Sequence, residues 1–236
     1  MARRRIVLTN DDGIDEPGLA ALARACAALG EVVVVAPVDA HSGVSHRVTE
    51  AELAVEERGG GWYAVAGTPA DCTRVALHAI CPDADWVVAG INAGANVGVD
   101  VYVSGTVAAA REAAIHGRPS LAISQYVRRY GAIDWRRTER AAAPVLRRAL
   151  ELGAAPGEYW NANLPDPTGP EGTAAAIRAG EIVECPVDTS PSPVGFERTS
   201  RGVAWRADYH ARPRRAHHDI DVCFGGRIAL TRLRIA

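Results

Sequence analysis

The sequence contains no lysine, and arginine supplies all 26 of its basic residues. This absence excludes chemistry that needs a lysine, such as a Walker-A phosphate loop, a Schiff base or a lysine general base. Acidic residues number 28, so the formal net charge is only −2. Extensive sequence-independent binding to a polyanion is therefore not expected, and we predict no stable nucleic-acid partner.

The five cysteines are odd in number and widely spaced, and no C-x-x-C motif occurs. This pattern argues against a disulfide framework and a structural zinc site, and it favours reduced thiols in a cytoplasmic protein.

Long apolar runs are also missing. Only residues 6–8 are apolar after the basic start, so we expect no signal peptide, and the strand-length run at residues 31–38 cannot span a membrane.

What the sequence does contain is a regular alternation of apolar runs and helix-like segments. The apolar runs, typical of strands buried on both faces, are residues 5–9, 32–36, 85–89 and 121–124. The helix-like segments are residues 17–29, 69–80 and 106–116. A composition of 48% hydrophobic and 23% charged residues excludes wholesale disorder. We therefore predict an α/β fold with a Rossmann-like, doubly wound and mostly parallel sheet, whose core spans residues 1–125.

Residues 48–65 do not fit this alternation, and three consecutive glycines at residues 59–61 predict a β-hairpin with a loose turn. Residues 134–152 predict a helix that Pro144 should kink. Further strands are predicted at residues 159–164 and 227–233.

Residues 166–215 are rich in proline, glycine, serine and arginine, which predicts loops and short strands. We interpret the charge run at residues 212–215 as a solvated face rather than a nucleotide or RNA contact. Residues 126–236 as a whole are interpreted as a smaller, irregular C-terminal extension that completes the sheet and carries oligomer contacts within one overall domain.

Ligands of a doubly wound sheet bind beyond the carboxyl ends of its strands, where Asp11, Asp12 and Ser42 are expected. The two acids follow the first strand, and Gly13 allows a turn that would bring both carboxylates to one point. Two adjacent acids at the end of a buried strand are costly unless paired or metal-bound, although a solvated turn is the alternative. Ser42 lies after the second strand, where an ordinary polar loop is the alternative.

Two further segments belong to the same edge. Asn92 and Asn96 lie among glycines after the third strand, where a structural loop is the alternative. Ser104, Gly105 and Thr106 open a helix whose free amide groups and dipole would attract an anion, the alternative being a plain helix cap.

Together the four segments supply carboxylate, hydroxyl and amide oxygens, which suit Mg²⁺, Mn²⁺ or Ca²⁺ rather than zinc or copper. A metal beside an anion-binding helix end suggests hydrolysis of a phosphate ester. A nicotinamide dehydrogenase would need a G-x-G-x-x-G motif after the first strand, and residues 10–13 stand there instead.

These segments resemble the SurE survival-protein nucleotidases. The matching stretches are residues 8–14, 34–37 with 42–43, 67–72, 90–96 and 104–110, with a weaker echo at residues 161–165. The resemblance implies a divalent-metal-dependent phosphatase that acts on nucleoside 5′- and 3′-monophosphates. It also implies a Rossmann-like fold with a protruding hairpin, assembled as a homodimer or homotetramer.

Carried over by position, the resemblance implies one divalent cation per subunit, Mg²⁺ or Mn²⁺, held by Asp11, Asp12, Ser42 and Asn92. It implies that Asn96, Ser104, Gly105 and Thr106 hold the phosphate, with Asp11, Asp12 and Asn96 as the catalytic group. We expect Asp11 to orient or deprotonate the attacking water, with a covalent aspartyl-phosphate as the alternative.

The sequence departs from the family pattern in two places. Ala95 replaces a proline, and Arg234 stands where the family has a histidine that is followed by a further helix. These departures leave one alternative function open, a non-catalytic regulator that binds nucleotide and metal on the same scaffold. Such a regulator would bind nucleotide without releasing phosphate.

Overall fold

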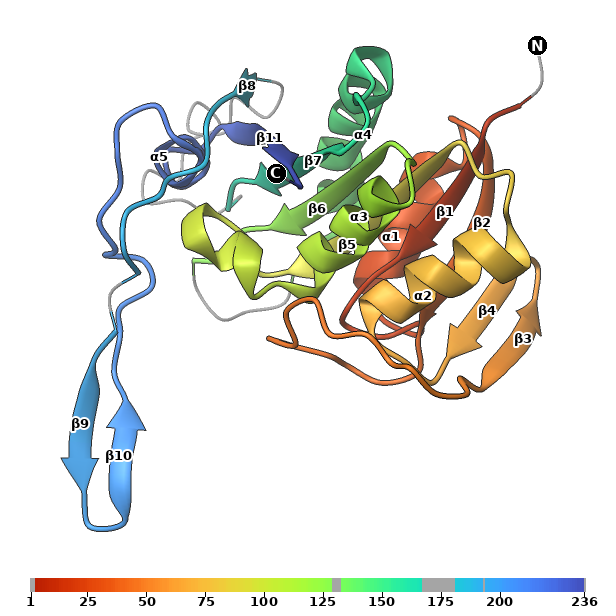
Figure 1. The fold of residues 1–236 in the computed structure, drawn as a ribbon. Coiled ribbons are helices and arrows are strands. Elements are labelled where there is room, and N and C mark those ends of the chain that lie inside the picture. The colour runs from red at the N-terminus through yellow and green to blue at the C-terminus, as the bar shows by residue number, and fades with distance from the viewer. Residues whose placement is uncertain (1–2, 129–132, 167–180, 193, 236) are drawn as a thin grey trace.

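The computed structural model describes residues 3–128, 133–166, 181–192 and 194–235 (Figure 1). Its strands are β1 (Arg5–Thr9), β2 (Glu31–Pro37), β3 (Val55–Gly59), β4 (Trp62–Val65), β5 (Trp86–Ala93), β6 (Ser120–Gln125), β7 (Glu158–Leu164), β8 (Ile182–Glu184), β9 (Phe196–Thr199), β10 (Gly202–Trp205) and β11 (Ile228–Arg234). Its helices are α1 (Pro17–Cys26), α2 (Pro69–Val75), α3 (Gly105–Ile115), α4 (Trp135–Leu152) and α5 (Asp219–Phe224). A π-helical turn, Ala76–Ile80, extends α2, and a 3₁₀ helix, Gly98–Tyr102, precedes α3.

Nine strands form one sheet in the order β3-β4-β2-β1-β5-β6-β7-β11-β8. Strand β1 lies between β2 and β5 and is parallel to both. The chain therefore winds outward in both directions from β1, which is the doubly wound arrangement. Within this sheet only the β3–β4 and β7–β11 pairs are antiparallel. The predicted fold class is confirmed.

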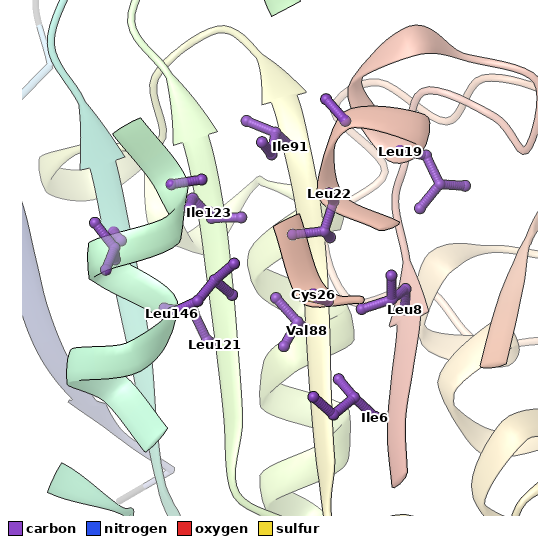
Figure 2. Close-up of a cluster of buried hydrophobic side chains, with 14 of the residues drawn as sticks. Ile6, Leu8, Leu19, Leu22, Cys26, Val88, Ile91, Leu121, Ile123 and Leu146 are labelled. Atoms are coloured by element: carbon purple, nitrogen blue, oxygen red, sulfur yellow. The ribbon is translucent and has the colours of Figure 1, made fainter. Parts of the chain in front are cut away.

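Helices cover both faces of the sheet, α1 and α4 on one and α2 and α3 on the other (Figure 1). Figure 2 shows the core beneath α1 and α4. There Leu22 of α1 and Leu146 of α4 point toward Leu8, Val88 and Leu121 on the sheet. The opposite core contains Val7, Val33 and Val87, the alternate residues of the same strands. The apolar runs of the sequence thus form strands buried from both sides.

The starts of α2 and α3 have side-chain caps. Thr68 Oγ1 accepts a hydrogen bond from the Asp71 amide at 3.2 Å, and the Asp71 carboxylate accepts one from the Thr68 amide at 2.9 Å. This reciprocal capping box begins α2 at Pro69. At α3 the Ser104 hydroxyl oxygen accepts a hydrogen bond from the Val107 amide at 3.1 Å. The start of α3 is therefore fixed, with its first turn against the carboxyl ends of the strands.

Strand β5 is longer than predicted, because its pairing continues beyond residue 89 to Ala93. The ladder with β6 is irregular between Ala89 and Asn92, where Gly90 has a φ of +136°. A Cβ at Gly90 would lie 2.2 Å from the carbonyl oxygen of Ile123, so only glycine fits. Pairing then resumes with Asn92 opposite Ser124, and Asn92 is a strand residue rather than part of the predicted loop.

The predicted hairpin at residues 48–65 is present but shorter, as β3 and β4 at one edge of the sheet. A second hairpin, β9–β10, projects from the rest of the chain (Figure 1). It lies within residues 166–215, where only loops and short strands were predicted. Helix α5 was not predicted, and α4 runs from Trp135 to Leu152 with Pro144 inside it. Residues 167–180 of the predicted loop region lie outside the described residues.

In the described part of the chain, no helix is long and apolar enough to cross a membrane. All five cysteines are buried and unpaired.

Candidate functional site

Asp11 follows β1 and is held against the first turn of α3. Its side chain is almost fully buried, with the residue 6% exposed, and it accepts a short hydrogen bond from the hydroxyl of Thr106. A Cβ at Gly105 would lie 2.9 Å from the Asp11 Cβ, so this close approach requires glycine. Burial raises the pKa of Asp11 to about 6, with hydrogen bonds from Thr106 opposing the shift and the charge of Asp12 adding to it.

Asp12 connects the same turn to the end of β5. Its Oδ2 accepts a hydrogen bond from the Ala93 amide at 3.4 Å. Burial raises the pKa of Asp12 as well. Among the described residues, neither Asp11 nor Asp12 forms an ion pair with an arginine or histidine. Two carboxylates are therefore gathered at one point without a positive side chain to neutralise them.

Ser42 and Asn92 belong to the segments on either side of β1. Ser42 lies in the loop that follows β2, and Asn92 lies near the end of β5. The His41 amide donates to the Asp11 carbonyl oxygen at 2.7 Å, which brings the loop after β2 to the aspartate. The next residue, Ser42, is exposed. Asn92 precedes Ala93 and donates through Nδ2 to the Gly94 carbonyl at 2.7 Å. That hydrogen bond uses the nitrogen of the Asn92 amide and leaves its oxygen available to a ligand.

The predicted phosphate-binding residues divide into two groups. Ser104 and Gly105 lie at the start of α3, where backbone amide groups of the first turn have no intrahelical partner. The Thr106 hydroxyl donates to Asp11 and orients that carboxylate, and the phosphate contact of Thr106 stays a prediction. The Val107 amide already donates to Ser104 Oγ, and the Thr106 backbone is bonded to Asp11, so the Gly105 amide and the Ser104 hydroxyl are the groups that remain for an anion.

Asn96 is held in a buried network of amides and hydroxyls. Its backbone amide donates to Asn163 Oδ1 and its Nδ2 to Ser124 Oγ, both at 2.8 Å. Its carbonyl oxygen accepts from Asn161 Nδ2 at 2.8 Å and from Asn163 Nδ2 at 3.0 Å. One hydrogen of the Asn96 side-chain amide is left for a ligand.

Ser124, Asn161 and Asn163 are supporting residues that the sequence analysis did not assign to the site. The two asparagines alternate within β7, so both point to the same face of a buried strand. Two fully buried amides in such a strand need polar partners, and that spacing was the available signal.

The predicted solvated face at residues 212–215 is wrong for its first residue. Arg212 is 5% exposed, and its Nη1 donates to Asp100 Oδ2 at 2.5 Å. Asp100 lies in the 3₁₀ helix just before α3. The ion pair therefore ties the segment after β10 to the loop that leads into the site, whereas Arg214 and Arg215 are exposed as predicted.

The described residues contain no group of three or more histidine, cysteine, aspartate or glutamate side chains able to hold a metal ion. The candidate ligands instead combine two carboxylates with a hydroxyl and an amide oxygen. Four segments distant in sequence, which follow β1, β2 and β5 and open α3, thus meet at the carboxyl ends of the parallel strands.

Comparisons with known proteins identify the fold and its relatives. The family model described as Survival protein SurE matches residues 6–184. A candidate 5′-nucleotidase of Synechocystis sp. is 45% identical over 230 residues, which cover 97% of this chain and 99% of that protein. The 5′-nucleotidase SurE of Pelobacter propionicus is 44% identical over 163 residues, covering 68% and 66% of the two chains.

A crystal structure of a SurE protein from Aquifex aeolicus is similar to this chain with a TM-score of 0.83 at 29% sequence identity. The similarity covers 98% of this chain and 94% of the Aquifex chain. The family-model match, the close relatives and the shared fold agree with one another, and the chain therefore belongs to the SurE family of nucleotidases.

Proposed function

We propose that this protein is a divalent-metal-dependent phosphomonoesterase that hydrolyses nucleoside 5′- and 3′-monophosphates to nucleoside and phosphate. One observation carries the proposal. Two carboxylates with raised pKa values, Asp11 and Asp12, lie without a positive partner in the described chain beside the N-terminus of α3. That arrangement provides a place for a cation next to a place for an anion.

The donor set supports one hard divalent cation per subunit, Mg²⁺ or Mn²⁺. Asp11, Asp12, Ser42 and Asn92 would hold it through oxygen atoms, the ligands these ions prefer. The two acid charges would balance those of the cation and relieve the repulsion that contributes to the raised pKa of Asp11. When bound, the cation would supply Lewis-acid polarisation of the phosphate.

The side chains and amides of the chain would perform the rest of the reaction. The first turn of α3 would bind the phosphate oxygens through the Gly105 amide, the Ser104 hydroxyl and the positive end of the helix dipole. Asp11, with a pKa of about 6, is ionised near neutral pH and accepts the proton of a water that attacks phosphorus. A new bond forms between that oxygen and phosphorus, the ester bond breaks, the leaving nucleoside oxygen takes a proton from solvent, and Asp11 returns its proton to solvent. Thr106 keeps Asp11 in place.

The test is phosphate release from 5′-AMP, 3′-AMP and other nucleotides by the purified protein with Mg²⁺, Mn²⁺ or a chelator. We expect chelation to lower the rate of phosphate release by about tenfold or more and either cation to restore it. Without the cation, the carboxylates of Asp11 and Asp12 would repel the phosphate dianion. Metal-dependent nucleotide binding without phosphate release would instead support the regulator.

Substitution of Gly105 by alanine should lower kcat by about tenfold to a hundredfold without unfolding the protein. The added methyl would lie 2.9 Å from Asp11 Cβ and 3.0 Å from its Oδ2, so the carboxylate must shift. Steady-state kinetics with 5′-AMP would measure the loss. The matched control is Gly117→Ala at the other end of α3, where φ is +71° and no atom lies within 4 Å. That variant strains the backbone but should keep kcat, and an equal loss in both would contradict the role of Gly105.

We also propose that copies of the chain associate, as a homodimer or homotetramer, through the β9–β10 hairpin. Phe196 is 61% exposed and packs edge-to-face on Trp205, which is also exposed. Such apolar side chains on a projecting arm support burial against another copy. The five buried, unpaired cysteines favour a reducing compartment, which supports a cytoplasmic location.

A further inference from the structure

The loop that carries Ser42 has no regular secondary structure of its own. It comprises residues 38–54, between β2 and β3, all of which the structure describes, and none of them belongs to a helix or strand. Gly43, next to Ser42, has a φ of +70°, and a Cβ there would meet no atom within 4 Å. The position of Ser42 therefore depends on the contacts that neighbouring residues of the loop make with other elements.

Hydrogen bonds fix the loop on both sides of Ser42. Before it, the His41 amide donates to the Asp11 carbonyl oxygen at 2.7 Å. After it, the Ser45 hydroxyl donates to the carbonyl oxygen of residue 102 at 2.7 Å, and the Ser45 amide donates to that of residue 103 at 3.0 Å. Ser42 thus lies between one anchor at the candidate site and another on the segment that leads into α3.

His46 adds an anchor that reaches the protein interior. Its Nε2 lies 2.6 Å from Oε2 of Glu112, whose side chain is fully buried on α3. Although burial opposes the shift, hydrogen bonds hold the pKa of Glu112 at about 2, so this carboxylate is ionised near neutral pH and can only accept. His46 Nε2 therefore carries a hydrogen and donates it to Glu112.

Glu112 is also held by residues outside the Ser42 loop. Its other oxygen, Oε1, accepts from His116 Nε2 at 2.9 Å and from Arg74 Nε in a short contact. His116 caps the end of α3 and Arg74 belongs to α2. The carboxylate is therefore a fixed acceptor against which His46 holds the loop.

Helix α3 connects this acceptor to the candidate metal site. The first turn of the helix lies against Asp11, through the hydroxyl of Thr106 and the close approach of Gly105. Glu112 lies farther along the same helix. A displacement of the Ser42 loop relative to Glu112 is thus also a displacement relative to Asp11.

We propose that His46 is a positioning residue for the candidate metal site. Its hydrogen bond to Glu112 keeps the loop in the place where the Ser42 hydroxyl can bind the cation. Because His46 acts through Ser42 and not on the substrate, its loss should weaken metal binding and leave the reaction of the loaded site unchanged. The proposal rests on the proposed metal-dependent nucleotidase function and adds a residue to its site.

The first test is Mn²⁺ binding without substrate, measured on the full-length protein by the electron paramagnetic resonance signal of the free ion. His46→Asn, whose shorter side chain does not reach Glu112, should raise the dissociation constant about tenfold. His46→Gln extends an amide N–H to the position of Nε2 and should retain most of the affinity. The matched control is His116→Asn, which removes a hydrogen bond from the same carboxylate but lies outside the loop. It should bind Mn²⁺ like the unmodified protein.

Kinetics separate positioning from a general loss of structure. In His46→Asn, the Mn²⁺ concentration for half-maximal phosphate release from 5′-AMP should rise about tenfold, and kcat with excess Mn²⁺ should stay within about twofold. A purely structural role would instead lower kcat alike in His46→Asn and His116→Asn.

The outcomes distinguish this proposal from the nucleotidase function. Unchanged Mn²⁺ affinity in His46→Asn, or equal weakening in His116→Asn, overturns the role of His46 even if phosphate is released. Weaker Mn²⁺ binding in His46→Asn alone, in a protein that releases no phosphate, supports the role of His46 and contradicts the nucleotidase proposal. An unmodified protein that binds no Mn²⁺ overturns both.

Discussion

Asparagine in place of Asp11 is expected to lower kcat for 5′-AMP about a thousandfold, within the range for loss of a general base. The substitution keeps the size of the side chain and an oxygen that can accept the Thr106 hydrogen bond. It removes the negative charge that would bind the cation and accept the proton of water. The fold should remain intact, so the loss would report on chemistry. Phosphate release with the same added Mn²⁺ in both proteins is the measurement.

The same substitution should stabilise the metal-free protein. Burial raises the pKa of Asp11 from 3.8 to about 6, so the folded state holds the proton more tightly than the unfolded state. For a raised pKa, this contribution to stability is fully present below about pH 4 and is lost as the pH rises through about 6. Near neutral pH the buried charge therefore costs on the order of 3 kcal/mol, and asparagine avoids that cost. Urea unfolding without metal would measure the gain.

Added Mn²⁺ should raise the unfolding free energy of the unmodified protein and leave that of Asp11→Asn nearly unchanged, since a cation that binds only the folded state stabilises it. The matched control is Asp15→Asn. Asp15 is exposed and pairs with Arg58 at 2.9 Å on the surface, so both activity and metal response should persist. A fully active Asp11→Asn protein, or one that Mn²⁺ stabilises normally, would refute the role of Asp11.

The parts of the fold that followed from the sequence are those set by local pattern. Apolar runs such as residues 32–36 must be buried on both faces, which already requires a sheet with helices on each side. Proline after Thr68 and acid at Asp71 specify a helix start without any tertiary contact. The doubly wound order then directs Asp11, Asn92 and the start of α3 to one edge.

The parts that did not follow depend on contacts between distant residues. The hydrogen bond from the Thr106 hydroxyl to Asp11 depends on the close approach that Gly105 allows, and no local pattern in the sequence specifies that approach. Arg212 is one of several arginines in its segment, and its burial depends on Asp100, more than a hundred residues earlier. Strands β9 and β10 form a two-stranded sheet apart from the nine-stranded one, and with four residues each they carry little pattern.

A buried carboxylate on α3 also joins segments that the sequence analysis treated separately. The Glu112 side chain is fully buried and accepts hydrogen bonds from three side chains. His46 Nε2 lies 2.6 Å from Oε2, His116 Nε2 lies 2.9 Å from Oε1, and Arg74 Nε makes a short contact with Oε1. His46 belongs to the same loop as Ser42, so Glu112 links α2, α3 and that loop.

Substitution of Glu112 by glutamine is expected to lower the unfolding free energy by about 3 kcal/mol near neutral pH. Glutamine keeps the shape but offers one acceptor oxygen and places an amide N–H against donors, which leaves the half-buried side chain of Arg74 without its counter-charge. Such a loss corresponds to a fall of about 6–12 °C in Tm for a chain of this size. Thermal unfolding followed by circular dichroism would measure it.

The pH dependence gives this prediction a second readout. Burial alone would raise the pKa of Glu112, but hydrogen bonds from His46, Arg74 and His116 outweigh it and hold the pKa at about 2. For a lowered pKa, the stabilisation is present above the ordinary value of 4.5 and is lost as the pH falls toward about 2. The difference in stability between the unmodified protein and Glu112→Gln should therefore shrink progressively below about pH 4.5.

Glu139→Gln is the matched control, because Glu139 also pairs with an arginine, Arg24, at 2.7 Å, but near the surface. The Glu139→Gln substitution should lower the unfolding free energy by less than about 1 kcal/mol, as is usual for exposed ion pairs. Equal destabilisation by both substitutions would mean that burial adds nothing to the Glu112 network. A Glu112→Gln protein as stable as the unmodified one would contradict the prediction. It would mean that the desolvation cost of this carboxylate cancels the gain from its three hydrogen bonds. The network would then position the Ser42 loop rather than stabilise the fold.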